Sequence, residues 1–68
     1  MKAVRYYTRP SSVSFEGCEQ ATAVCYDKDG RTYDIHHWVS AETAQQHVEY
    51  LNTPGMGREA ALALARSS

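Results

Sequence analysis

The sequence is short of cysteine, which excludes one common class of small protein. Its 68 residues include two cysteines, Cys18 and Cys25, too few for the disulfide frameworks that hold many small secreted domains together. The two lie in one expected extended segment, where about 3.3 Å per residue separates them by about 23 Å. We therefore expect free thiols and no bridge between them.

Long apolar runs and a strong net charge are also missing. The sequence has neither a stretch of about 18 apolar residues nor a signal-like run after Met1, so we expect no export and no membrane insertion. The formal net charge of -1 disfavours direct nucleic-acid binding, which depends on neutralising phosphates. With 43% hydrophobic and 22% charged residues, the composition is that of one small globular domain over residues 1–68.

Extended patterns fill the first part of the chain. The segments 2–8, 12–17, 18–26 and 31–39 are rich in β-branched and aromatic residues or alternate apolar with polar ones, and each predicts a strand. Pro10 is expected to interrupt the first strand, because it has no N–H to donate to a ladder. Asp29-Gly30 predicts a tight hairpin between the last two strands, since both residue types tolerate a positive φ.

Helical spacing replaces the strand pattern after residue 39. Ser40 is a good N-cap, and apolar residues then recur every three or four positions, which predicts a helix over 41–51. Pro54 and Gly55 end this helix, and good helix formers predict a second one over 57–66. The order of elements predicts an α+β domain, with a four-stranded antiparallel sheet followed by two short helices packed on one face.

The histidines and cysteines do not form a recognisable reactive site. His36 and His37 alternate along a strand, so they point to opposite faces and cannot both bind one metal ion. We expect one imidazole near the core and the other exposed. No spacing places a histidine beside Cys25, which is expected to be a small buried hydrophobe. We therefore expect no catalytic residue, no metal, no cofactor and no enzymatic activity.

The segment PGMG, residues 54–57, has two glycines before a helix, as phosphate-binding loops do. It lacks the Lys-Ser or Lys-Thr pair of a P-loop and does not follow a strand. The glycines are therefore interpreted as a tight corner between two packed helices.

The aromatic residues are the most informative feature, because most of them lie on predicted strands. If the last strand buries Tyr33, Ile35 and Val39, then Asp34 and Trp38 face the other way, on a sheet face that the helices do not cover. An exposed aromatic among polar residues is typical of a protein interface. The alternative is a partly buried tryptophan that completes a small core, and the pattern leaves both open.

Taken together, the start MKAVRY, the segment SVSFEG, the DG hairpin and the end SAET…YLNTPGMGR resemble the type I-F anti-CRISPR proteins. These are small phage proteins that bind the backbone of the Csy surveillance complex. From residue 30 to 68 the spacing matches without an insertion or deletion, whereas the first loops must be shortened. The resemblance implies four antiparallel strands, two helices and no enzymatic activity. It also implies a protein of the host cytoplasm that grips the Cas backbone subunits and blocks pairing of guide RNA with target DNA.

The resemblance also suggests contact residues. The family uses a tyrosine on the first strand, matched by Tyr6, and an aromatic residue on the second, where Phe15 stands. Its acidic residue on the third strand falls near Cys25, where this chain has no carboxylate, so nearby acidic residues are the candidate replacements. The expected partner-binding residues are Tyr6, Phe15, Glu16, Tyr26, Asp34 and Trp38.

A monomer is expected on this interpretation, and an alternative is kept beside it. The chain could be a small non-enzymatic interaction or dimerisation module of a phage or bacterial operon, pairing through an unprotected edge of its sheet. An enzyme using Cys25 or the histidines is a third possibility, disfavoured because so short a chain hardly encloses a water-excluding pocket.

Overall fold

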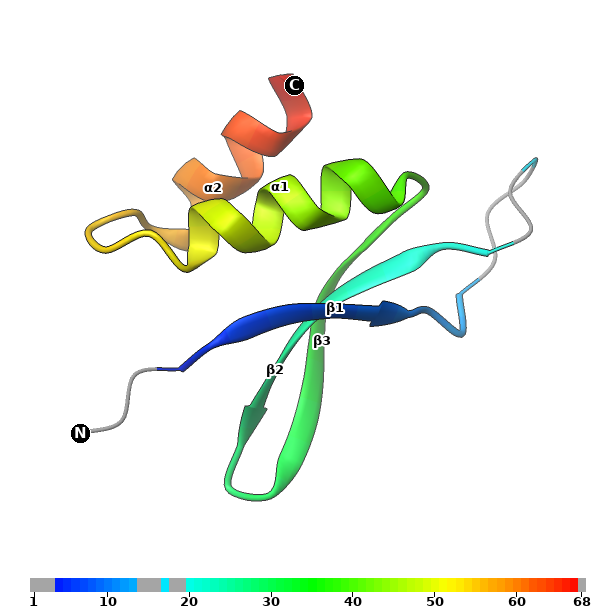
Figure 1. Ribbon diagram of the computed structural model, residues 1–68, viewed down its shortest axis with the longest axis horizontal. Helices are drawn as coiled ribbons and strands as arrows, with labels where there is room; N and C mark the ends of the chain where they lie inside the picture. The colour runs from blue at the N-terminus through cyan, green and yellow to red at the C-terminus, as the bar shows by residue number, and fades with distance from the viewer. Residues whose placement is uncertain (1–3, 14–16, 18–19, 68) are drawn as a thin grey trace.

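The fold consists of one small sheet and two helices, seen in a computed structural model that describes residues 4–13, 17 and 20–67. The elements are β1 (Tyr6–Pro10), β2 (Thr22–Lys28), β3 (Arg31–Trp38), α1 (Ala41–Leu51) and α2 (Arg58–Ser67). The sheet is antiparallel in the order β1-β2-β3, and both helices lie on the same side of it (Figure 1). The predicted α+β class is confirmed.

The sheet of the described residues has three strands, where the sequence predicts four. The missing strand is the one expected over residues 12–17. Ser12 and Val13 belong to no strand and Gly17 lies in a turn, while residues 14–16 are outside the described part of the chain. Two of the expected contact residues, Phe15 and Glu16, therefore also lie outside it.

Strand β1 is an edge strand that includes Pro10, although this proline was expected to interrupt the strand. Pro10 is paired in register with Thr22, and the N–H of the next residue, Ser11, donates to the carbonyl of Ala21 at 3.0 Å. Since backbone groups alternate in direction along an antiparallel strand, the nitrogen of Pro10 faces away from β2. No ladder hydrogen bond is lost there, so the proline is tolerated.

The hairpin between β2 and β3 turns at Asp29 and Gly30, as predicted. Their φ values are 53° and 78°, the positive values that a two-residue hairpin turn of type I′ requires. Lys28 pairs with Arg31 next to the turn.

A bulge interrupts the register of this hairpin. Cys25 pairs with Asp34 but Val24 pairs with His36, so Ile35 is an extra residue in β3. An extra residue reverses the alternation of side chains beyond it. Both Ile35 and Trp38 consequently pack against the core, and the expectation that they face opposite ways is wrong.

Two further residues of this region were expected in the core and are exposed. Tyr33 is 40% exposed and Val39, just past the end of β3, is 57% exposed. The tryptophan is the partly buried one that the alternative interpretation describes.

Helix α1 covers the sheet and contacts all three strands. It begins at the expected N-cap, where the Ser40 hydroxyl accepts a hydrogen bond from the N–H of Thr43 at 3.4 Å. Ala44 and Val48 of α1 form the core with Val24 of β2. The partly buried residues packed around this core are Tyr6, Ile35, Trp38 and Leu51.

Helix α2 packs on α1 and, among the described residues, on no strand. Its buried residues are Ala61 and Ala65, 0% and 1% exposed, whose small side chains allow the two helices to approach closely. The chain reverses between the helices at Gly55, whose φ is 84°. The prediction that both helices pack on the sheet is therefore wrong, because α2 forms a third layer beyond α1 (Figure 1). Neither helix has the length and apolar character needed to cross a membrane.

Candidate protein-interaction surface

Three tyrosines form a continuous row across the sheet. Tyr6, Tyr26 and Tyr33 are direct neighbours on β1, β2 and β3. The ring centroids of Tyr6 and Tyr26 are 5.5 Å apart and those of Tyr26 and Tyr33 are 5.4 Å apart. The first pair is tilted by 59° and the second is stacked with an interplanar angle of 26°. We call these residues the tyrosine row.

The tyrosine row lies on the same sheet face as α1, because Tyr26 is two residues from Val24 in β2 and Val24 packs against that helix. Tyr26 and Tyr33 belong to the β2–β3 hairpin, which extends beyond the helix (Figure 1). Tyr6, at one end, also packs against the core, whereas Tyr33, at the other, is 40% exposed. Within the described part of the chain, no hydroxyl of the row makes a hydrogen bond, and none is buried. Buried tyrosine hydroxyls usually find a hydrogen-bond partner. The hydroxyls of this row are neither buried nor bonded, so the row combines apolar ring area with free polar groups.

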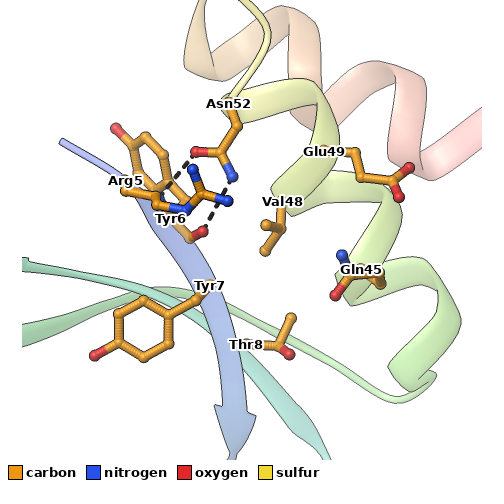
Figure 2. Close-up of a pocket in the computed structure, with 8 residues that line it drawn as sticks. All are labelled: Arg5, Tyr6, Tyr7, Thr8, Gln45, Val48, Glu49 and Asn52. Carbon is orange, nitrogen blue, oxygen red and sulfur yellow. Dashed lines mark hydrogen bonds between the residues drawn. The ribbon is translucent and has the colours of Figure 1, made fainter. Parts of the chain in front are cut away.

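The position of Tyr6 is fixed by the residue that ends α1. The side-chain amide of Asn52 accepts a hydrogen bond from the Tyr6 N–H at 3.0 Å and donates one to the Tyr6 carbonyl at 3.1 Å. We call this pair of bonds the Asn52 bridge, and Figure 2 shows both as dashed lines. A strand would form the same two bonds, so the amide occupies the edge of β1 in place of another strand.

A groove of about 480 Å³ runs between this edge and α1 (Figure 2). It is lined by Arg5, Tyr6, Tyr7, Thr8, Gln45, Val48, Glu49 and Asn52. Along β1, the backbone groups of every second residue point away from β2. The backbone groups at this edge are therefore those of Tyr6, Thr8 and Pro10. The Asn52 bridge bonds the backbone N–H and carbonyl of Tyr6, and Pro10 has no N–H. This leaves Thr8, between the two, to pair with another strand. The β1 edge is thus largely protected against strand pairing.

The opposite face of the sheet is polar, and its side chains bond to one another. The Arg9 guanidinium donates to Asp34 through Nε at 3.0 Å and through Nη2 at 2.9 Å. Because Asp34 and Tyr33 are consecutive in β3, Asp34 faces away from the tyrosine row. This expected contact residue is therefore part of an ion pair on the far face.

A second group on that face centres on Asp27. The hydroxyls of Thr32 and Tyr7 both donate to its Oδ1, at 2.6 and 2.7 Å. These two bonds, that of Thr32 first, lower the pKa of the Asp27 carboxyl, and the carboxylate in turn raises the pKa of Tyr7. At the other end of the same face, beyond the Arg9–Asp34 pair, the Ser11 hydroxyl lies 2.6 Å from Nδ1 of His37.

Trp38 is partly buried and packs against the core under α1. Its indole Nε1 donates to Nδ1 of His47 on α1 at 3.2 Å, and its ring lies 4.3 Å from that of His36. His36 therefore faces the helices while His37 bonds to Ser11 on the far face, which confirms that the two histidines point to opposite sides of the sheet.

The thiol of Cys25 is not arranged as a nucleophile. The side chain is fully buried, Sγ donates weakly to the carbonyl of Tyr7 at 3.4 Å, and burial is the main cause that raises the pKa of the thiol. A raised pKa disfavours the reactive thiolate. The residues that the structure describes contain no group of three or more histidines, cysteines or carboxylates able to hold a metal ion.

Of the expected contact residues, Tyr6 and Tyr26 come together in the tyrosine row, whereas Asp34 and Trp38 lie elsewhere. The sequence interpretation missed Tyr33. Counting back from the two-residue turn pairs residue 28 with 31 and residue 26 with 33, so the hairpin signal could have found it. Comparison with known proteins finds no matching family model, no matching curated protein and no matching solved structure.

Proposed function

We propose that this protein is a non-enzymatic binding domain that contacts a partner protein through the tyrosine row. The observation that supports the proposal is a row of three adjacent rings that runs from Tyr6, beside the core, to the exposed Tyr33 on the hairpin, with hydroxyls free to bond. Aromatic side chains are enriched at the centres of protein interfaces, where a few of them provide most of the binding energy.

The proposed partner is a type I CRISPR surveillance complex, bound at its Cas backbone subunits in the host cytoplasm. Binding there would block the pairing of guide RNA with target DNA. The support is the sequence resemblance to the type I-F anti-CRISPR proteins, together with the position of Tyr6, the best-matched contact residue, within the tyrosine row. A standard interface needs about 800 Å² from each partner, which a domain of this size can supply.

A gel shift of target DNA with purified Csy complex tests this proposal. We expect the protein to co-elute with the complex in size exclusion and to prevent DNA binding when it is added before the DNA. Failure to co-elute would reject this complex as the partner. Sedimentation velocity of the chain alone tests the dimerisation alternative: a monomer is expected, and a tight homodimer would favour that alternative.

A pair of tyrosine variants tests the surface itself. Tyr33 and Tyr7 are 40% and 36% exposed, but Tyr33 belongs to the row and Tyr7 to the opposite face. Tyr33→Ala should weaken binding by about tenfold or more, equivalent to about 1.4 kcal/mol. Tyr7→Ala is the matched control and should bind like the wild type. Equal affinities for the two variants would place the interface elsewhere.

A further inference from the structure

A cluster of one buried and two partly buried aromatic side chains joins α1 to the last strand. His47 of α1 is 1% exposed and meets Trp38 and His36 of β3, with ring centroids 5.6 and 5.9 Å away and nearly perpendicular planes. The Nε2 atom of His47 is the one buried side-chain nitrogen or oxygen in the described ranges that has no hydrogen-bond partner. Since buried polar atoms are normally paired, this ring is in an unusual position.

The hydrogen bond from Trp38 determines where the His47 ring carries its proton. An indole nitrogen can only donate, so Nδ1 of His47 must accept and its hydrogen must lie on Nε2. A second proton could then bind only at Nδ1, where it would face the indole N–H. Two donors would oppose each other, and the hydrogen bond between α1 and β3 would be lost.

The surrounding charges would not compensate for such a proton. The groups that act on His47 are His36 from β3 and Arg58 from α2, and those that act on His36 are Arg66 from α2 and His37. None of these groups is acidic. Burial first, and then these neighbours, lower the pKa values of both His47 and His36, so both rings are neutral near pH 7.

We propose that the cluster of His47, Trp38 and His36 is an acid-sensitive contact that holds α1 on the sheet while His47 is neutral and releases it when His47 gains a proton. Helix α1 ends at the Asn52 bridge, so its release also frees Tyr6. The proposal concerns the protein alone and stands whether or not the tyrosine row binds the proposed partner.

The direction of the pH effect follows from proton binding. Histidine in the unfolded chain has a pKa of about 6.5, and the folded values lie below it. The unfolded state therefore binds protons first, so stability is complete above about pH 6.5 and falls as the pH drops toward the folded values. Each histidine involved lowers the folding equilibrium constant by about tenfold per pH unit in this window.

Urea unfolding between pH 7.5 and 5, followed by the fluorescence of the single tryptophan, tests the proposal. The His47→Gln variant keeps a side-chain oxygen that can accept from Trp38 but cannot titrate. We expect its stability to vary with pH by about tenfold per unit less than that of the wild type. Gln45→Ala, which changes an exposed, non-titrating residue of the same helix, is the control and should retain the wild-type pH dependence. Identical pH dependence in His47→Gln and the wild type would overturn the proposal.

Nuclear magnetic resonance of the wild type supplies a test that does not depend on a variant folding. As the pH falls, the indole N–H signal of Trp38 should shift or disappear together with the titration of the His47 ring, below the ordinary histidine range. Titration of His47 near pH 6.5 with an unchanged indole signal would contradict the proposed mechanism.

Discussion

The two faces of the sheet use their polar groups in different ways. On the far face, Arg9 is bonded to Asp34, and Tyr7 and Thr32 are bonded to Asp27. On the helix face, the tyrosine row offers its rings and hydroxyls to solvent. A face whose polar side chains bond to one another gains little from a partner, because each new bond must replace an existing one. Exposure alone therefore does not identify an interface in this protein.

The length of α1 explains why the helix face is divided. A helix of 11 residues spans about 16 Å at a rise of 1.5 Å per residue. It covers the region of Val24, Ile35 and Trp38, while the β2–β3 hairpin continues beyond it (Figure 1). The covered part supplies the core, and the uncovered part supplies the candidate interface.

The largest expected effect is in the covered part of the helix face. Val24→Ala removes two methyl groups from a fully buried position and should lower the free energy of unfolding by about 2–3 kcal/mol. Small domains have about 5 kcal/mol or slightly more in total, so urea or thermal unfolding will show the change clearly. Lys28→Ala, at the exposed end of the same strand, is the control and should stay within about 0.5 kcal/mol of the wild type. Similar losses in both would mean that α1 does not bury this part of the sheet.

A smaller effect is expected where the covered and uncovered parts meet. Asn52→Ala removes both bonds of the Asn52 bridge at a partly solvated site and should cost about 1 kcal/mol. Amide hydrogen exchange is the direct measurement, because the Tyr6 N–H loses its acceptor and should exchange faster. Asn52→Asp retains an acceptor for that N–H but no donor for the carbonyl, so its Tyr6 amide should remain more protected than in the alanine variant. Unchanged exchange in both variants would show that Asn52 does not hold Tyr6.

The smallest effect is expected on the far face. A double-mutant cycle with Arg9→Ala and Asp34→Ala should give a small coupling energy, well below the effect of Val24→Ala, since the pair is close to solvent. The coupling should decrease further as salt is added. A coupling energy as large as the effect of Val24→Ala would mean that this face contributes to stability as much as the core does.

The sequence predicted the parts of the fold that depend on local chemistry. Ser40 and the apolar spacing predicted α1 to the residue, and Asp29-Gly30 predicted the hairpin. The bulge at Ile35 was not predictable in this way, because it reflects how β3 packs against β2 and α1 together. That one residue explains why Trp38 packs against the core.

The same distinction applies to the candidate site. Tyr6 and Tyr26 were expected on strands and lie there, and Tyr33 follows from the turn. The role of Asp34 depends on Arg9, which is 25 residues away in sequence, and no local spacing indicates such a pair. The position of α2 was likewise not predictable, since the alanines that bury it against α1 resemble those of any exposed helix.

The Asn52 bridge also has a consequence for the order of synthesis. Its two partners are 46 residues apart, so a ribosome that adds about 5–20 residues per second completes Tyr6 about 2–9 seconds before Asn52. During that interval the edge of β1 near Tyr6 lacks the amide that later occupies it, and a nascent chain is open to pairing with other extended segments. Pro10 comes from the same early part of the chain, so it limits such pairing before the helices exist.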